Sequence, residues 1–481
     1  MGSLNRESVR EEAERIKLDF NRLSSSKKMD SETKMLFQSM LMLVNLLIAI
    51  FLEKTTKKTS KNSSKPPSQT EKDESSLSHN GTNGKGKTES DVIANNTRTI
   101  ETVTTMSVTE CDMCGADLSE YPCEHVERRT KIDIIFEKTV EHVDIEIKHC
   151  DNCDSIVKGK FPSDMSGPLQ YGNGLKAYII SLLICQMVAL NRVQKMIKSL
   201  IGELISEATL LKYVLRLYNA LENWELSATE HLLKCTAINV DETSLRVDKK
   251  NHWIHVYSSG DITLKFLHRK RGTEAIDDIN LIPRYFGTII HDCWSSYLTY
   301  NHCNHSLCGS HLLRELTCVI ESNNYQWAKN TKALLRETCK AVSKRKNKKL
   351  DEQEYANLQK RYRNILTRGE KELPVIPKKP NGKRGPMAKS DAHNLWERLK
   401  EYESCVILFA KKSDVSFTNN RAERDLRMAK VKQKVSGCFR SEIYAKAYCR
   451  ISSYLQTMSS KGHNPLISIQ MVLAGKVDLG G

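Results

Sequence analysis

CTAINVDETSLRV at residues 235–247 and FGTIIHDCWSSY at residues 286–297 are short runs rich in β-branched and aromatic residues, and each contains an aspartate, Asp241 or Asp292. Runs of this kind, bounded by turn residues, predict β-strands. We expect Asp241 to end the first strand and Asp292 to end the fourth. The three other predicted strands are NHWIHVYSSG (251–260), DITLKFLHRKRG (261–272) and HSLCGS (305–310).

Three carboxylates in this part of the chain predict a site for phosphodiester chemistry. Two-metal cleavage needs carboxylates that converge on ions about 4 Å apart, and Mg²⁺ prefers oxygen ligands. In a ribonuclease H-like sheet the first and fourth strands are neighbours, so Asp241 and Asp292 would meet there. Glu423, on a late predicted helix, would supply the third ligand for Mg²⁺ (or Mn²⁺). Glu242 is the alternative to Asp241, although strand alternation points it to the opposite face.

The segment TNNRAERDLRMAKVKQKV (418–435) predicts the helix that carries Glu423, entered through the capping residues Asn419 and Asn420. Lys430 lies two turns after Glu423 and so on nearly the same face. Cations here could bind DNA phosphates, although an ordinary solvated basic helix is the alternative. The candidate DNA-binding residues are Arg421, Arg424, Arg427, Lys430, Lys432 and Lys434.

Four cysteines in two Cys-x-x-Cys pairs predict a structural Zn²⁺ site: Cys111, Cys114, Cys150 and Cys153. Two such pairs complete a closed tetrahedral set of thiolates. The intervening residues 128–150 alternate like the hairpin of a zinc ribbon. Cys123 and His125 could substitute as ligands, and four unligated cysteines are the alternative to a zinc site.

A second cluster has spacings that match no closed tetrahedral site: His302, Cys303, His305, Cys308 and His311. We expect a packed strand–turn–helix here, with a further metal site as the alternative. Arg314 and Glu315 follow directly and could orient groups of the active site.

The composition favours a polyanionic partner, because 74 Lys and Arg against 58 acids give a net charge of +16. Fifteen cysteines with no apolar signal core at the N-terminus predict a reduced, cytoplasmic setting. The apolar run at residues 35–52 is long enough to span a membrane. Its polar residues favour an oligomerising or core helix, and we expect no membrane contact.

We expect an α+β multidomain protein with a ribonuclease H-like catalytic domain that contains a helical insertion. The predicted parts are an N-terminal helical segment (1–53), a disordered linker (54–104), a zinc-binding domain (105–162), a helical DNA-binding region (163–233), the catalytic domain (234–450) with its insertion at about 317–405, and a helical tail (451–481).

These motifs resemble the large catalytic subunit of the insertion-sequence-66 family of bacterial transposases. The resemblance rests on KNSSKPPS, the two cysteine pairs, NVDET, IIHDCWSSY, CGSHLLREL and FTNNRAERDLRMAKVKQKVSGCFRS. It implies a ribonuclease H-like domain, the acidic triad of Asp241, Asp292 and Glu423, catalytic Mg²⁺, and transposon-end and target DNA as substrates. It also implies small accessory proteins as partners of a homo-oligomer.

The sequence departs from many acidic-triad transposases just before the glutamate. Those enzymes carry a Tyr and an Arg where this chain has the residues 417–420, FTNN, although the spacing from Glu423 to Lys430 is retained. The functional alternatives are a non-catalytic zinc-dependent DNA-binding protein derived from a decayed transposase, a membrane-anchored protein, and a nuclease that cuts without joining.

Overall fold

The computed structural model describes residues 102–133, 137–165, 167–374 and 389–477, together with Arg15 and Met40. These residues divide into two compact units. The first contains the described part of 223–454, and the second contains the described parts of 82–222 and 455–478. The predicted segment 1–53 and most of the predicted linker 54–104 lie outside the described residues. Among the described residues, no helix has the length and apolar character needed to cross a membrane, and the run 35–52 lies outside them except for Met40.

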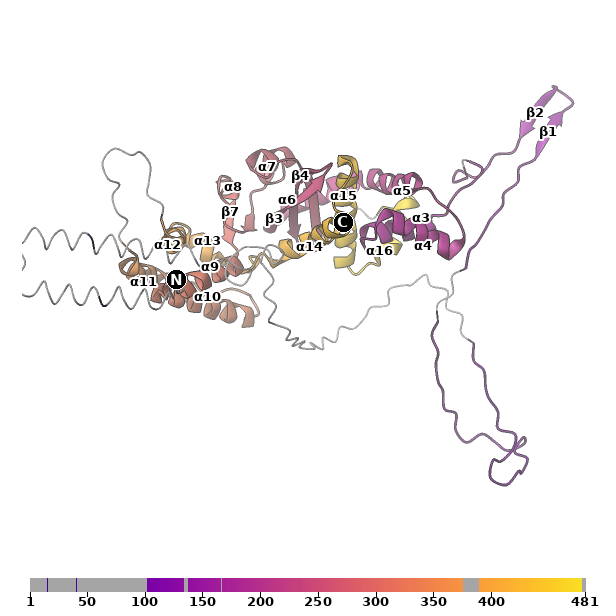
Figure 1. The fold of residues 1–481 in the computed structure, drawn as a ribbon, viewed down its shortest axis with the longest axis horizontal. Helices are drawn as coiled ribbons and strands as arrows, with labels where there is room; N and C mark the ends of the chain where they lie inside the picture. Colours follow the sequence, from indigo (N-terminus) through magenta and orange to yellow (C-terminus); the bar gives the residue numbers. More distant parts are fainter. Residues whose placement is uncertain are drawn as a thin grey trace, which may run out of the picture. The chain divides into compact units, whose positions relative to one another are not determined.

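A five-stranded sheet organises the first unit, and all five predicted strands are confirmed (Figure 1). The sheet order is β5-β4-β3-β6-β7. The pairs β3/β4 and β4/β5 are antiparallel, whereas β3/β6 and β6/β7 are parallel. The strands are β3 (Ala237–Val247), β4 (Lys250–Ser259), β5 (Ile262–His268), β6 (Thr288–His291) and β7 (Asn304–Leu307).

β3 is longer than the sequence predicts. Its antiparallel pairing with β4 continues to the pair Val247↔Lys250, and Asp248 and Lys249, both with positive φ, form the tight turn. Asp241 therefore lies in the middle of β3, and the prediction that it ends the strand is wrong. The strand continues because β4 still pairs with it beyond Asp241, while the parallel pairing with β6 stops at Asn239.

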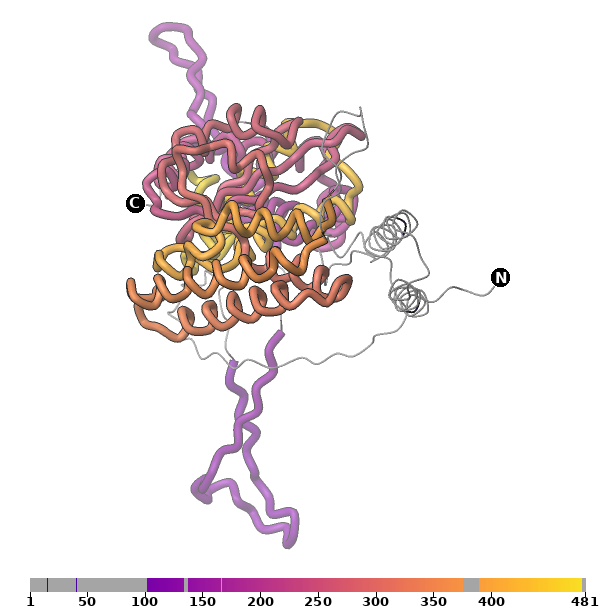
Figure 2. The backbone as a smooth tube through the Cα atoms, turned by 90° about the vertical axis from the view of Figure 1, so that its left-hand side faces the viewer, coloured from indigo at the N-terminus to yellow at the C-terminus, as the bar shows by residue number. Residues whose placement is uncertain are grey.

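Helices surround this sheet and form an insertion between β7 and the helix that carries Glu423. That helix, α14, packs against β3 and β4, and α13 packs against β7. Figure 2 shows the insertion helices, in orange, running alongside one another. The helices of the unit are α6 (Glu222–Lys234), α7 (Thr273–Ile279), α8 (Ser295–Leu298), α9 (Gly309–Asn323), α10 (Gln326–Lys344), α11 (Glu352–Gly369), α12 (Asp391–Glu401), α13 (Glu403–Lys411), α14 (Asn420–Ser436) and most of α15 (Glu442–Ser460), with the short 3-10 turns Ile282–Arg284 and Glu370–Glu372.

The insertion helices have a core of their own that is continuous with the sheet. The buried rings of Trp327, Tyr362 and Trp396 belong to one apolar cluster with Ile290 of β6 and Leu307 of β7. The indole of Trp396 donates to a carbonyl of α11, and the hydroxyl of Tyr362 donates to a carbonyl of α12. This shared core fixes α9, which begins directly after β7, against the sheet.

The described residues of the second unit contain a short hairpin, α3 (Asn173–Ile184), α4 (Leu190–Ile201), α5 (Glu207–Ala220), α16 (Pro465–Leu473) and the end of α15. The helices predicted over 163–233 are confirmed as α3, α4 and α5, with α6 mostly in the first unit. α16 packs against α3 and α5. The hairpin pairs β1 (Ile147–Cys150) with β2 (Ser155–Lys158). The described residues between 128 and 146 form no strand, so the prediction of a hairpin between the two cysteine pairs is wrong. The turn residues lie at 151–154, and the strands pair across the second cysteine pair.

Candidate functional site

Asp241 and Asp292 lie at the same level on neighbouring parallel strands. β3 and β6 pair in the register Ala237↔Thr288, Ile238↔Ile289 and Asn239↔Ile290. Two residues further along each strand are Asp241 and Asp292, and side chains two residues apart share a face. Asp292 directly follows β6, and the next residue, Cys293, has a left-handed backbone (φ 33°) that is uncommon for a residue other than glycine. The chain therefore turns sharply away from the sheet at this carboxylate.

Asp241 and Asp292 are half-buried carboxylates of like charge beside the buried Glu242. Burial raises the pKa of Asp241 well above its ordinary value, and the negative charges of Glu242, Asp292 and, to a smaller extent, Glu423 add to the rise. Burial also raises the pKa of Asp292, which the positive charges of Arg271 and Arg398 lower in part. The backbone N–H of Glu242 donates to Oδ1 of Asp241 (2.8 Å). A divalent cation would relieve this repulsion, because it favours the charged form of each acid.

Asn419 fixes the beginning of α14 on β3. The predicted helix is confirmed with Asn419 at its N-cap position, but the side chain makes no capping hydrogen bond. Instead its amide donates to the carbonyl of Val240 (2.7 Å) and accepts from the amide of Asn239 (2.9 Å). Its backbone N–H donates to Sγ of Cys308 (3.1 Å). Because Val240 precedes Asp241, these bonds position the first turn of α14 near Asp241, whose pKa the negative charge of Glu423 helps to raise. Among the described residues, the ligand atoms of Asp241, Asp292 and Glu423 do not all lie within 4.8 Å of one another.

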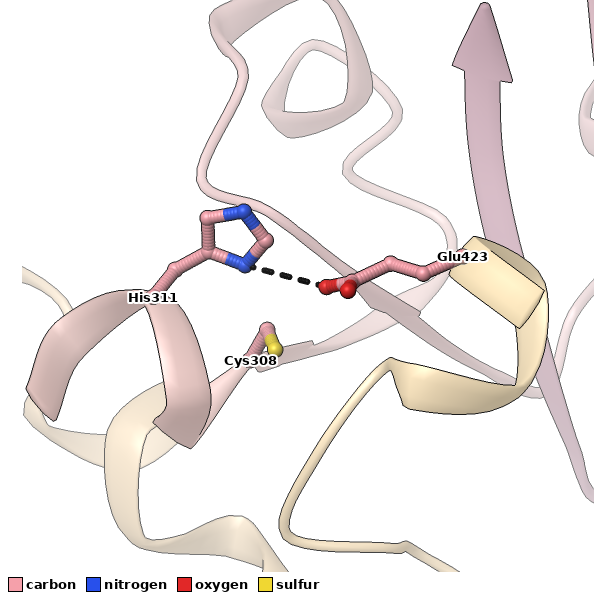
Figure 3. Close-up of side chains that lie close together, drawn as sticks. All are labelled: Cys308, His311 and Glu423. Carbon is pink, nitrogen blue, oxygen red and sulfur yellow. Dashed lines mark ion pairs between the residues drawn. The ribbon is translucent and has the colours of Figure 1, made fainter. Parts of the chain in front are cut away.

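Glu423 faces α9. Its Oε1 lies 3.5 Å from Nδ1 of His311 and 3.8 Å from a guanidinium nitrogen of Arg314. Both Oε1 of Glu423 and Nδ1 of His311 are buried and make no hydrogen bond among the described residues. Figure 3 shows the imidazole and the carboxylate pointing toward one another, with the thiol of Cys308 beside them. Arg314 therefore lies beside Glu423, whereas Glu315 pairs with Arg398 of α12; that either residue orients a group of the active site stays a prediction.

Glu242 occupies a different environment from Asp241. Its carboxylate accepts from Arg271 (2.6 and 2.8 Å) and from the hydroxyl of Tyr297 in α8 (2.7 Å). Arg271 also stacks over Trp294, with its guanidinium carbon 4.3 Å from the ring centroid. Glu242 is thus already paired within the protein, which favours Asp241 over Glu242 as the ligand that β3 contributes.

The six basic residues of α14 fall into two groups. Arg421 donates to the carbonyls of Gly260 and Ile262, and Lys430 donates to the carbonyl and hydroxyl of Ser244 in β3 (2.7 and 3.0 Å). Burial lowers the pKa of Lys430 and of Lys432. The side chains exposed to solvent are Arg424, Arg427 and Lys434.

The predicted packing of the His/Cys cluster holds for three of its five members. His302, Cys303 and His305 each hydrogen-bond to a backbone carbonyl, as side chains of a packed strand–turn–helix do. Cys308 and His311 differ, because together with Glu423 they form a group whose possible ligand atoms lie within 4.8 Å of one another. The spacing CGSH contained this pair, but only the fold shows that Glu423 completes it.

The cysteines of the second unit form two separate pairs. Cys111 lies in a turn closed by the N–H of Gly115, and Cys153 donates its backbone N–H to the carbonyl of Cys150 (3.3 Å). Within each pair the side chains are in hydrogen-bond contact. Among the described residues the four thiols are not gathered into one group of metal-ligating atoms, so the zinc site stays a prediction, as do Cys123 and His125 as substitute ligands.

Comparison with known proteins identifies the chain's family. A sequence model of the Transposase IS66 family matches residues 168–447, which is more than half of the chain. The chain belongs to this family. No match was found among curated proteins. The matched region of this transposase domain includes Asp241, Asp292 and Glu423, while the cysteine pairs lie before it.

Two arginines of the transposase domain act on the acidic group and were not foreseen from the sequence. Arg271 follows β5 in the run HRKRG, and Arg398 lies on α12 of the insertion. Their positive charges lower the pKa of Asp292. Basic residues are frequent throughout this chain, so only the tertiary structure distinguishes these two.

Proposed function

We propose that this member of the IS66 family is a DNA transposase whose catalytic residues are Asp241, Asp292 and Glu423. The observation that carries the proposal is the register of β3 and β6, because it aligns two aspartates that are about 50 residues apart in sequence on adjacent strands. The sheet order, with three antiparallel strands followed by two parallel ones, supports a ribonuclease H-like catalytic domain.

The acidic group fits divalent Mg²⁺ or Mn²⁺. Its donors are carboxylate oxygens, the ligands that these ions prefer, and Oε1 of Glu423 is a buried acceptor that receives no hydrogen bond from the part of the chain that the structure describes. Two bound ions would supply polarisation of the phosphodiester and a lowered pKa for the attacking hydroxyl. Asp241 and Asp292 would hold both ions, and Glu423 would complete one site.

The chain's own residues would position the DNA. Arg424, Arg427 and Lys434 offer solvent-exposed cations along α14 for phosphate contacts. Lys430 and Arg421 would help to position the DNA indirectly. Lys430 donates to β3 and Arg421 donates to the β4–β5 turn, and these bonds hold α14 in place. In the first reaction, water attacks a phosphodiester at the transposon end and a 3′-hydroxyl leaves. In the second, that hydroxyl attacks a target phosphodiester, so one P–O bond forms as one breaks.

A cleavage and joining assay tests the proposal. The full chain is incubated with Mg²⁺, target DNA and labelled DNA taken from the flanks of its own gene, with and without cellular extract to supply accessory proteins. We expect nicked ends and joined products that both require the divalent ion. Cleavage without joining would indicate a nuclease, and DNA binding without cleavage would indicate a non-catalytic, zinc-dependent DNA-binding protein.

A further inference from the structure

Cys308, His311 and Glu423 form a second metal-ligating set, of which the proposed reaction uses only Glu423. Cys308 is buried at the start of α9, His311 follows one turn later, and Glu423 reaches them from the first turn of α14 (Figure 3). A thiol, an imidazole and a carboxylate are the ligand types that bind Zn²⁺, whereas Mg²⁺ prefers oxygen donors.

The distances agree with a tetrahedral ion. Ligands at about 2.0–2.3 Å from Zn²⁺ are roughly 3.3–3.8 Å apart in tetrahedral geometry. Nδ1 of His311 and Oε1 of Glu423 are already 3.5 Å apart, and all three ligand atoms fall within 4.8 Å. Side-chain adjustment of about an ångström would therefore close the set around one ion, with a fourth position left for water.

The surroundings prepare each group to act as a ligand. Burial lowers the pKa of His311 to about 4, with the charges of Arg314 and Arg398 adding to the effect, so the imidazole is neutral at physiological pH. The backbone N–H of Asn419 donates to the sulfur of Cys308 (3.1 Å), whereas burial raises the pKa of this thiol. A divalent cation would supply the charge that the thiolate needs.

Arg314 would compete with a bound metal ion for the carboxylate of Glu423. Its guanidinium lies 3.8 Å from the same Oε1 of Glu423 and also donates to the carbonyl of Ser310. This long contact is weak compared with a bond to a divalent ion, and Arg314 can turn away because its side chain is partly exposed. Arg314 would then be displaced from Glu423 when a metal binds.

We propose that Cys308, His311 and Glu423 bind a thiophilic divalent cation such as Zn²⁺, and that this ion withholds Glu423 from the catalytic Mg²⁺ site. Binding releases the thiol proton of Cys308 to solvent. The site would make the transposase sensitive to Zn²⁺, because an ion bound by Cys308 and His311 would hold Oε1 of Glu423 toward α9 and so away from the catalytic ion. The regulatory half of this inference rests on the proposed function, whereas the metal site does not.

Zinc content and cobalt spectroscopy test the site in the full chain. After equilibration with Zn²⁺, we expect Cys308→Ser and His311→Gln each to bind one ion fewer than wild type. Replacing Zn²⁺ by Co²⁺ should give thiolate-to-cobalt absorption that Cys308→Ser loses in part. The control Cys318→Ser, at a buried cysteine of the same helix outside the group, should match wild type. Equal zinc content in wild type and both variants, with unchanged far-UV circular dichroism, would overturn the site.

Inhibition of DNA cleavage by Zn²⁺ tests separately whether the bound ion withholds Glu423 from the catalytic site. With Mg²⁺ in excess, added Zn²⁺ should inhibit wild type and Cys318→Ser at least about tenfold more strongly than Cys308→Ser, which corresponds to about 1.4 kcal/mol of binding free energy. Equal inhibition of wild type, Cys318→Ser and Cys308→Ser would overturn this regulatory role. If wild type shows no cleavage at all, the proposed function fails, while the zinc-content difference still decides whether the metal site exists.

Discussion

Asn419 is the residue through which α14 is fixed to β3. Its buried side chain bonds to the Val240 carbonyl and the Asn239 amide, so its removal takes one hydrogen-bond partner from each of these groups. We expect Asn419→Ala to lower the free energy of unfolding by about 2 kcal/mol or more, measured by denaturant titration. Asn420→Ala, at the exposed neighbour, should change it by less than about 0.5 kcal/mol. Equal effects of the two substitutions would refute this role for Asn419.

The raised pKa of Asp241 predicts that the folded chain loses stability as the pH rises. Its pKa is raised in the folded chain, so the native state binds more protons than the unfolded state above about pH 3.9, the ordinary pKa of an aspartate. Its contribution to stability therefore falls as pH rises through this window. Without divalent ions at neutral pH, Asp241→Asn should unfold at a higher temperature than wild type.

Mg²⁺ should make wild type unfold at a higher temperature than Asp241→Asn, the reverse of the order expected without the ion. An ion that binds only the native state stabilises it by mass action, and Asp241→Asn would lose this gain. The measurement is thermal unfolding of both proteins at acidic and neutral pH, with and without Mg²⁺. A wild type that Mg²⁺ does not stabilise, or a variant less stable than wild type at neutral pH without Mg²⁺, would count against a buried acidic metal site.

At the scale of elements, Gly309 sets how closely α9 approaches the segment before α14. A Cβ built at Gly309 would lie 2.2 Å from the ring of Phe417, and the Gly309 N–H donates to the Phe417 carbonyl (2.8 Å). We expect Gly309→Ala to destabilise the protein by about 1–3 kcal/mol through overpacking. Gly272→Ala, which meets nothing within 4 Å, is the matched control.

A double substitution distinguishes this contact from a general effect of alanine. If the clash with Phe417 is the cause, Gly309→Ala combined with Phe417→Ala should be less destabilising than the sum of the two single changes. Strict additivity in denaturant unfolding would contradict the contact. The same approach of backbones brings Cys308 within reach of the Asn419 N–H, so strain here should also disturb the position of Glu423.

The elements themselves were largely predictable. All four residues of β6, TIIH, are buried, and two adjacent isoleucines lie at its centre. The helices predicted over 163–233 show apolar spacing of three and four. The sequence-based predictions were wrong where the choice of the neighbouring strand decides the length or the existence of a strand. Asp241 lies inside β3 because β4 pairs beyond it, and the described residues between 128 and 146 form no strand although the sequence alternates there. Alternation predicts a strand's faces but does not specify its partner.

The sequence predicted that Asp241 and Asp292 belong to neighbouring strands, and the pairing of β3 with β6 confirms this. Their catalytic role stays a prediction, and the contacts that the acidic residues make could not be predicted. Glu242's pairing with Arg271 and Tyr297, and the meeting of Cys308 and His311 with Glu423, join segments far apart in sequence. No local pattern encodes such contacts, because they depend on how the helices of the insertion pack.

At the scale of the whole molecule, the cysteine pairs lie before the region that matches the transposase family. We expect Cys150→Ser to lose one zinc ion per chain and to expose residues 105–162 to protease, because a structural zinc site supplies folding free energy directly. The sheet domain should keep its own unfolding transition. Cys123→Ser is the control, and loss of zinc in that variant would instead indicate that Cys123 is a ligand.

The most direct test of the central claim is Mg²⁺-dependent cleavage by Asp241→Asn, Asp292→Asn and Glu423→Gln. The control is Asp261→Asn, at an exposed acid beside the same sheet. Each variant is first shown to bind the end DNA as tightly as wild type. We predict that the three triad variants lose cleavage at least about a hundredfold, while Asp261→Asn cuts normally. If any of the three, folded and bound to DNA, cleaves at the wild-type rate, the acidic triad assigned here is wrong.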